Sequence, residues 1–322
     1  MRSPLREDNG QNDDGDQHHR QRRVDQPDGA VGPYGHHAGV LALLRDELCH
    51  VLLLWPTWGH EFGGFTSDGQ LVAVRPTGEC GSCAQCTSGF PHTCHQAAAS
   101  LHGTSINGGL AEFVRVESSR MVPVPAGTDP AAVGLVEPLA VVIHGVNRVR
   151  LTSGMSAMVV GSGSIGLLTA AVLADRGINV DIVCRHPHQF EAAQKLGVNA
   201  VSKPGSNYDV SFDAVCTQES LDTCFNATRP RGDVVEFGMI WSGIQLKNQM
   251  MLKEISLVPS IFYSHNHEQN DFEDAVDMLV RHPELITTLV THRFSLEDSV
   301  EAFAVANDRQ AGAIKVHIFT QI

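Results

Sequence analysis

The chain has 322 residues, of which 42% are hydrophobic and 18% charged, with a formal net charge of −13 and eight cysteines. Its length suggests about two domains, and its apolar content excludes a wholly disordered chain. The acidic balance argues against nucleic acid or an anionic membrane as the main partner, because both repel a negative surface. The first residues do not resemble a secretory signal, so a disulfide scaffold is not expected. We therefore expect a cytoplasmic protein in which some cysteines bind metal.

The first thirty residues differ in composition from the rest of the chain. Their only apolar side chains are those of Met1, Leu5, Val24 and Ala30. So little apolar surface does not offset the conformational entropy that is lost on ordering. This part of the chain is therefore expected to be disordered, ahead of a globular region.

Regular patterning follows this segment. Its first part is predicted to contain strands at 71–75 and within 109–124, a cysteine-rich lobe at 80–94, and an apolar helix or linker at 131–146. Strands and helices then alternate, which implies a parallel sheet with helices on both faces. The predicted strands are 157–160, 180–183, 212–216, 233–237, 255–262 and 313–319, and the predicted helices are 165–175, 188–196, 220–227, 270–281 and 296–306.

One uncharged segment, from Met155 to Ala174, is about long enough to span a bilayer. The alternative is a buried strand, a glycine turn and a buried helix. Three glycines and three serines weaken the membrane interpretation. Because the turn also explains how the glycines are spaced, we expect the strand–turn–helix arrangement.

Within this segment Gly161, Gly163 and Gly166 form a G-x-G-x-x-G sequence between a predicted strand and a predicted helix. In that context the sequence is typical of dinucleotide binding. Gly161 permits the tight turn, Gly163 lets the pyrophosphate approach the backbone, and Gly166 lets the helix pack closely on the sheet. The first N–H groups of the helix, around Ser164 and Ile165, would bind the phosphates. An ordinary glycine turn is the alternative.

The residue after the second strand indicates which dinucleotide binds. An NAD site places an acidic residue there to bind the ribose hydroxyls. Here Asp181 comes too early and is expected inside the strand, whereas Arg185 occupies the approximate position. An arginine pairs well with a 2′-phosphate. NADP is therefore predicted in preference to NAD, and a surface arginine on a loop is the alternative.

The cysteine-rich lobe has the pattern C-x2-C-x2-C-x7-C, formed by Cys80, Cys83, Cys86 and Cys94. Four thiolates this close suit a closed tetrahedral zinc site, which is structural because it leaves no open coordination position. Two disulfides or an iron–sulfur cluster are the alternatives. A reducing compartment disfavours the disulfides, whereas spacing alone does not distinguish zinc from iron–sulfur. The other cysteines show no such grouping: Cys49, Cys184, Cys216 and Cys224.

Three further motifs occur in order with these two, namely 59–61 (GHE), 108–113 (GGLAEF) and 136–140 (VEPLA). Together they make residues 53–322 resemble the zinc-dependent medium-chain dehydrogenases, especially the sorbitol and threonine dehydrogenase branch. The resemblance implies an α/β fold with a β-rich GroES-like catalytic domain and a Rossmann domain whose parallel sheet is doubly wound. The implied boundaries are 1–147 with 265–322 for the catalytic domain and 148–264 for the Rossmann domain. It also implies an active site between the domains and a homodimer or homotetramer.

The resemblance implies a second, catalytic zinc. His60 matches a histidine ligand, Glu61 matches a ligand or ligand-exchanging residue, and Glu137 matches the carboxylate of the polyol-dehydrogenase branch. One imidazole with carboxylates suits an open zinc site. The metal would polarise a carbonyl or stabilise an alkoxide while hydride passes between the carbinol carbon and the nicotinamide. Without the resemblance, His60 would be interpreted as a packed or surface histidine and Glu137 as a helix-end carboxylate.

One family element is missing. The family carries a Cys-Gly-x-Asp segment upstream of Gly-His-Glu, and its cysteine is a catalytic zinc ligand. The only upstream cysteine here is Cys49, eleven residues before His60. That spacing is too short for the family's intervening loop, so we expect a buried thiol and keep Cys49 only as a doubtful ligand. Our hypothesis is that residues 1–54 come from a shifted reading frame or a misplaced gene start. The alternative is a natural N-terminus that has lost the ligand.

The leading interpretation is therefore a zinc-dependent oxidoreductase. It would transfer a hydride between NAD(P), preferably NADP, and a small-molecule alcohol or polyol, or the corresponding aldehyde or ketone. A catalytically impaired homologue that still binds nucleotide and the structural zinc is one alternative. A zinc-independent quinone-type reductase of the same superfamily is another, and the cysteine lobe and Glu137 argue against it.

Overall fold

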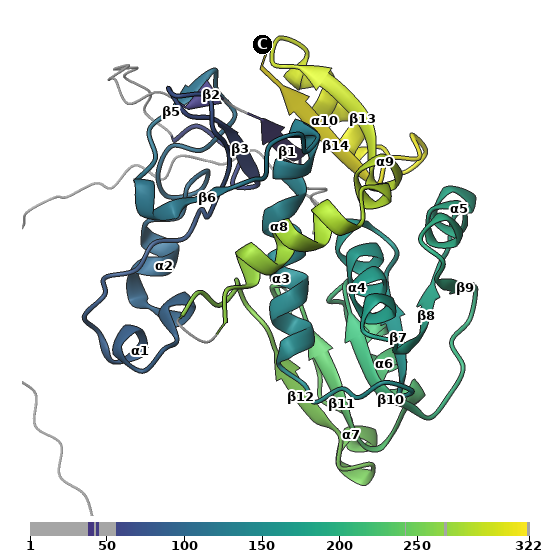
Figure 1. Cartoon of the computed structure of the whole chain (residues 1–322). Helices are drawn as coiled ribbons and strands as arrows, with labels where there is room; N and C mark the ends of the chain where they lie inside the picture. The colour runs from purple at the N-terminus through teal and green to yellow at the C-terminus, as the bar shows by residue number, and fades with distance from the viewer. Residues whose placement is uncertain (1–37, 42, 45–55, 242, 267–268, 321–322) are drawn as a thin grey trace, which may run out of the picture. The chain divides into compact units, whose positions relative to one another are not determined.

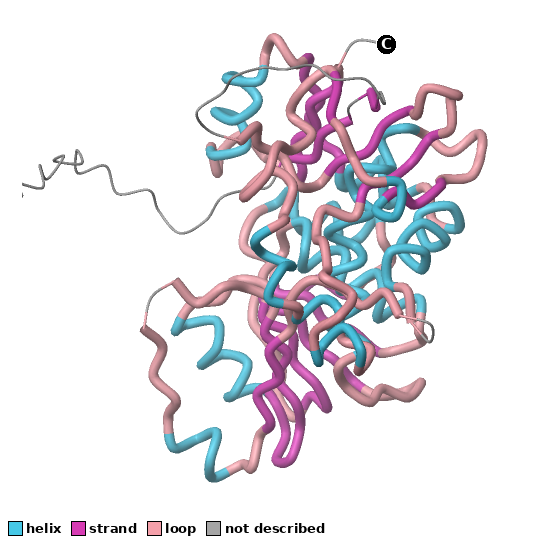
Figure 2. Tube along the Cα trace, turned by 90° about the vertical axis from the view of Figure 1, so that its left-hand side faces the viewer, coloured by secondary structure: helices cyan, strands magenta, loops and turns pink. Residues whose placement is uncertain are grey.

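The computed structural model of the chain describes residues 38–41, 43–44, 56–241, 243–266 and 269–320. Within these residues the strands form two six-stranded sheets, seen as separate groups in Figure 1 and Figure 2, and one two-stranded sheet. Helices pack against the sheets, so the chain has the predicted α/β class.

The second six-stranded sheet is parallel throughout, with the strand order β12-β11-β10-β7-β8-β9. This strand order is the doubly wound arrangement of dinucleotide-binding domains. The chain starts at β7 and builds the sheet outward in one direction through β8 and β9, then returns to the other side of β7 and continues through β10, β11 and β12, so the direction reverses between β7 and β10. Ligands bind beyond the carboxyl ends of the strands at such a point. The strands are β7 (Ser156–Val160), β8 (Asn179–Val183), β9 (Asn199–Val201), β10 (Tyr208–Asp213), β11 (Thr228–Glu236) and β12 (Ser256–Pro259).

The uncharged segment that matched a bilayer in length forms β7, a glycine turn and the buried helix α4 (Ser164–Asp175). The strand–turn–helix prediction is therefore correct, and α4 stops before Gly177, whose φ is +71°. Among the described residues, one helical stretch, 130–147, has the length and apolar composition to cross a membrane, and 83% of it is buried inside the protein. The other helices of this region are α5 (Pro187–Lys195), α6 (Gln218–Ala227) and α7 (Asn248–Leu252).

The first six-stranded sheet joins the two ends of the described chain. Its order is β13-β14-β1-β3-β4-β6, and β1 (Ala38–Leu41) pairs in parallel with both β14 and β3. Residues 38–41 therefore form a strand within the 1–54 segment for which the sequence analysis proposes a shifted reading frame or a misplaced gene start. The other strands are β3 (Phe62–Phe65), β4 (Leu71–Val74), β6 (Met121–Pro123), β13 (Val290–Ser295) and β14 (Lys315–Phe319), and the two-stranded sheet contains β2 (Leu43–Leu44) and β5 (Phe113–Val114).

The helix α3 (Val133–Asn147) links the two sheets. It contacts β3 and β4 of the first sheet, β11 of the second, and the helices α4 and α8 (Asp271–Arg281). Because it has neighbours on every side, nearly all of its residues are buried. The helix continues through Pro138, so Glu137 lies in the helix interior and the helix-end interpretation of this carboxylate is wrong. The remaining helices are α1 (Ala84–Thr87), α2 (His95–Ala99), α9 (Glu284–Leu289) and α10 (Ser299–Asn307).

The predicted strand at 212–216 is wrong in position, because β10 ends at Asp213. One oxygen of the Asp213 carboxylate accepts hydrogen bonds from the backbone N–H groups of Val215 and Cys216, which turns the chain. Cys216 then adopts a φ of +64°, outside the strand region. The sequence analysis also missed several elements, including the strands β3, β9 and β13 and the helices α7 and α9. The domain boundaries at 147/148 and 264/265 remain a prediction.

Candidate active site

The glycine turn lies between β7 and α4, at the point where the strand order reverses. Gly161 has a φ of +97°, and a Cβ atom at Gly166 would lie 1.8 Å from the Gly161 carbonyl oxygen. Both positions therefore require glycine. A Cβ at Gly163 would meet no atom within 4 Å, so the space beside this residue is open. The turn at Gly161 and the close packing at Gly166 agree with the sequence pattern, whereas the approach of a pyrophosphate at Gly163 stays a prediction.

The start of α4 offers backbone donors to an anion. Its N-cap is Gly163, no side chain caps it, and its first turn contains no acidic residue. The first N–H groups, including those of Ser164 and Ile165, have no acceptor inside the helix. Together with the positive end of the helix dipole they suit a pyrophosphate.

Arg185 lies just beyond the carboxyl end of β8, the neighbour of β7. Its side chain is 67% exposed and forms only a loose pair with Glu219, 3.8 Å from Nη2 to Oε1. It is therefore available to a ligand at this edge of the sheet. Asp181 lies inside β8, as predicted, and its carboxylate accepts hydrogen bonds from Tyr208 and Asn199. The carboxylate of Asp181 is thus engaged within the sheet and not beyond its carboxyl end.

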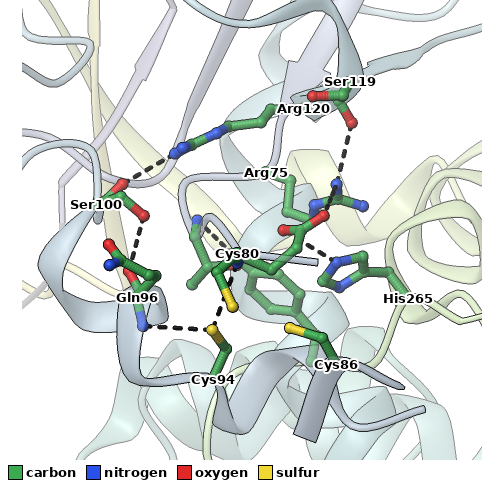
Figure 3. Close-up of polar contacts among 12 residues, drawn as sticks. Arg75, Cys80, Cys86, Cys94, Gln96, Ser100, Ser119, Arg120 and His265 are labelled. Carbon is green, nitrogen blue, oxygen red and sulfur yellow. Dashed lines mark hydrogen bonds and ion pairs between the residues drawn. The ribbon is translucent and has the colours of Figure 1, made fainter. Parts of the chain in front are cut away.

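The four cysteines of the lobe converge, and Figure 3 shows the sulfur atoms of Cys80, Cys86 and Cys94 pointing toward one another. All four sulfurs lie within 4.8 Å of one another. The Sγ–Sγ distances are 3.5 Å for Cys83–Cys86 and 3.7 Å for Cys83–Cys94, close to the edge of about 3.8 Å of a tetrahedron with 2.3 Å zinc–sulfur bonds. All four are free cysteines, so the disulfide alternative is wrong.

Backbone donors around the lobe stabilise thiolates. Cys80 Sγ accepts from the N–H of Cys83 at 3.3 Å, and Cys94 Sγ accepts from Gln96 at 3.3 Å. Hydrogen bonds from the Ser82 backbone and side chain lower the pKa of Cys80 to about 5. The sulfur geometry suits one ion at the centre of the group, so the residues fit a structural zinc.

The second group consists of His60, Glu61 and Glu137, with one donor atom from each within 4.8 Å of the others. Glu61 directly precedes β3, and Glu137 reaches the same place from the interior of α3. Both carboxylates are buried. Burial first, and then the negative charge of Glu61, raises the pKa of Glu137 to about 8, while Lys315 acts in the opposite direction. The three predicted residues are thus brought together, although they span 78 positions from His60 to Glu137.

The strand β14 adds two residues to this group, and the sequence analysis assigned a role to neither of them. Lys315 is fully buried and donates a hydrogen bond from Nζ to Glu61 Oε2. His317 packs against α3, where a Cβ at Gly134 would lie 2.9 Å from its ring. Burial, with the charge of Lys315, lowers the pKa of His317 to about 3, so its ring is neutral. In the sequence, Lys315 stands out only as part of the segment 313–316 (AIKV), which contributes to the family resemblance but indicates no role for the lysine.

This second group fits an open zinc site. Two buried carboxylates repel each other, one lysine compensates only part of their charge, and a cation among the three donors would relieve the rest. One imidazole and two carboxylates are ligands that zinc accepts. Cys49, the doubtful ligand, lies outside the described residues.

Comparison with known proteins identifies two family domains in this chain. Residues 58–126 match the alcohol dehydrogenase GroES-like domain, and residues 164–281 match the zinc-binding dehydrogenase domain. The chain belongs to the zinc-type medium-chain dehydrogenases. It is therefore an NAD(P)-dependent alcohol oxidoreductase by family, and the resemblance found in the sequence is confirmed.

Three relatives illustrate the similarity. The chain is 28% identical over 265 residues to L-idonate 5-dehydrogenase (NAD(P)(+)) of Escherichia coli, covering 76% of this chain and 75% of that protein. It is 26% identical to sorbitol dehydrogenase of Bombyx mori (78% and 76% covered) and 25% identical to L-threonine 3-dehydrogenase of Bacillus velezensis (80% and 80%). The solved structure of the E. coli L-idonate 5-dehydrogenase superposes with a TM-score of 0.73, covering 82% of this chain and 81% of that one.

Proposed function

We propose that this protein is a zinc-dependent dehydrogenase that oxidises a secondary alcohol of a polyol or sugar acid, with NADP preferred over NAD. The observation that carries the proposal is the group of His60, Glu61 and Glu137, whose two carboxylates are buried, on a chain that also has a dinucleotide-binding sheet. The substrate class comes from relatives whose names specify L-idonate and sorbitol.

The cofactor is proposed to bind across the glycine turn. Its pyrophosphate occupies the open space at Gly163 and accepts hydrogen bonds from the first N–H groups of α4. Arg185 reaches the adenosine ribose from the end of β8 and pairs with a 2′-phosphate. On binding, the exposed guanidinium of Arg185 gives up only its loose ion pair with Glu219. An exposed pair of this kind contributes little free energy, so its loss costs little affinity.

His60, Glu61 and Glu137 are proposed to hold the catalytic zinc. When bound, the metal acts as a Lewis acid on the substrate oxygen. Lys315 fixes one oxygen of Glu61 through a buried ion pair. Burial raises the pKa of Glu137 to about 8, so a metal held by this carboxylate would compete with a proton. Cys80, Cys83, Cys86 and Cys94 are proposed to hold a separate structural zinc.

The assembly is proposed to be a homodimer or homotetramer in the cytoplasm. The strand β12 forms an edge of the parallel sheet, and the loop and helix before it expose large apolar side chains. Trp241 is 78% exposed. Soluble monomers rarely display such a patch, which favours a second copy of the chain as its cover. The exposed side chains are Met239, Ile240, Trp241, Leu246, Met251 and Leu252.

Turnover and metal content test the proposal together. We expect the purified protein to oxidise members of a polyol and sugar-acid panel, with kcat/KM higher for NADP than for NAD. The His60→Ala variant should lose turnover and one zinc per chain. A protein that is inactive on the whole panel, and whose zinc content does not fall in H60A, is instead the catalytically impaired homologue.

Arg185→Asp tests the choice of cofactor. We expect its kcat/KM ratio for NADP over NAD to fall at least tenfold, because a carboxylate repels the 2′-phosphate and binds the ribose hydroxyls of NAD. Arg176→Asp, which changes a charge at the other end of α4, is the control. An unchanged ratio in R185D would remove Arg185 from the cofactor site.

A further inference from the structure

A third group of chemically active side chains lies at the carboxyl edge of the parallel sheet. Asp213 ends β10 and Glu236 ends β11, and the two are paired directly across these strands. Cys216 follows in the loop after β10. One donor atom from each of the three residues lies within 4.8 Å of the others. The sequence analysis found no grouping for Cys216, because Glu236 is twenty residues away.

The two carboxylates are buried and incompletely bonded. Asp213 is 0% exposed and Glu236 is 4% exposed. Asp213 Oδ1 accepts from Val215 at 2.9 Å and from Cys216 at 3.0 Å, but Oδ2 has no hydrogen-bond partner among the described residues. Glu236 Oε2 is also without one within this part of the chain. A buried carboxylate oxygen without a partner is costly, so each needs a proton or a cation.

Among the residues that the structure describes, no basic side chain pairs with either carboxylate. Burial raises the pKa of all three groups. The negative charge of Glu236, and then that of Asp213, further raises the pKa of Cys216, and the charge of Asp213 further raises that of Glu236. Neither lysine nor arginine contributes to any of the three shifts. When the three acidic groups are ionised, they place uncompensated negative charge in a buried site, and a metal ion would compensate it.

We propose that Asp213, Cys216 and Glu236 form a further binding site for a divalent cation of the zinc type. A thiolate with two carboxylate oxygens is a donor set that zinc accepts, whereas magnesium and calcium take oxygen ligands alone. Zinc bonds of about 2.0–2.3 Å require donors about 3.3–3.8 Å apart, so side-chain movements of roughly 1 Å close the site. Cys216 is partly exposed, which gives the ion access and leaves a position for water.

The position of the site in the fold separates it from the other two. It lies across the strand-order reversal from the glycine turn, since a Cβ at Gly161 would lie 2.5 Å from Cγ2 of Val215, the residue before Cys216. Gly238 closes the other side, where a Cβ would lie 1.9 Å from Cys216 Sγ. The site uses none of the residues assigned to the catalytic or structural zinc.

Metal counting tests the site. The full chain is saturated with Zn²⁺, passed through gel filtration, and its zinc is measured per chain by mass spectrometry. We expect Cys216→Ala to hold one zinc fewer than the unsubstituted protein. Cys184→Ala, which removes a buried thiol that belongs to no donor group, should retain the full number. The double variant D213N/E236Q keeps the side-chain volumes and should also lose one zinc.

A loss of one zinc in C216A or in D213N/E236Q, with a circular dichroism spectrum unchanged, supports the site. Unchanged zinc content in both variants overturns it and means that the two carboxyl groups are protonated instead. The result is independent of the proposed catalytic zinc, because loss of that ion is scored separately in H60A.

Discussion

The buried carboxyl of Glu137 makes the stability of the metal-free protein depend on pH. Its pKa is raised to about 8, from an ordinary value of 4.5, by burial and by the charge of Glu61. The native state therefore binds this proton more tightly than the unfolded chain does. The contribution of this bound proton to the free energy of unfolding is fully present below pH 4.5 and is lost as the pH rises toward 8. Glu137→Gln has nearly the same shape but does not titrate, so it removes this dependence alone.

The magnitude follows from the shift. Each pKa unit corresponds to 1.36 kcal/mol, so ionising Glu137 in the folded protein costs about 5 kcal/mol in total. Part of that cost is already present at pH 5, because the unfolded group is mostly ionised there. Between pH 5 and pH 9 we therefore expect the unfolding free energy of the original protein to fall by about 4 kcal/mol relative to that of E137Q.

The assay is urea unfolding of both proteins, stripped of metal with a chelator, at pH values from 5 to 9. Titrating groups that do not interact with Glu137 are common to the two proteins and cancel in the difference, which therefore reports Glu137 together with its interactions with Glu61 and Lys315. The difference should grow steadily and level off above pH 8. A difference that stays constant within about 1 kcal/mol, as an exposed carboxylate would give, refutes the buried environment assigned to Glu137.

Three further predictions concern the other parts of the site. Lys315→Met removes the buried cation that pairs with Glu61 and should cost about 3–5 kcal/mol in urea unfolding. Exposed Lys195→Met should cost almost nothing, and equal losses would contradict the buried pair. Gly163→Ala should keep the unfolding free energy but weaken NADPH binding at least tenfold in a fluorescence titration, because the Cβ of the alanine enters the open space beside this residue. Unchanged affinity would place the pyrophosphate elsewhere. Cys94→Ser should remove one zinc per chain and lower the Tm by about 5 °C or more; a full zinc content would show that the lobe does not bind the ion.

Local patterns were enough to predict the parts of the site that lie close together in sequence. The glycine turn occupies six consecutive residues, and the roles of Gly161, Gly163 and Gly166 depend only on a strand, a turn and a helix that follow one another. The cysteine lobe is similar, since four thiols within fifteen residues meet whenever the loop closes. The α/β class also followed from local periodicity. The group of His60, Glu61 and Glu137 came from a family resemblance, because no local pattern joins residues so far apart.

The tertiary structure alone decided the contacts between distant segments. Lys315 and Glu61 are 254 positions apart, and they meet because β14 returns to the sheet that contains β3. Asp213 and Glu236 become neighbours only through the register of two parallel strands. The interior position of Glu137 depends on α3 packing between the two sheets, which holds the helix together through Pro138. Sequence determines these contacts only through the packing of the whole chain, since burial and strand register are properties of the assembled sheets.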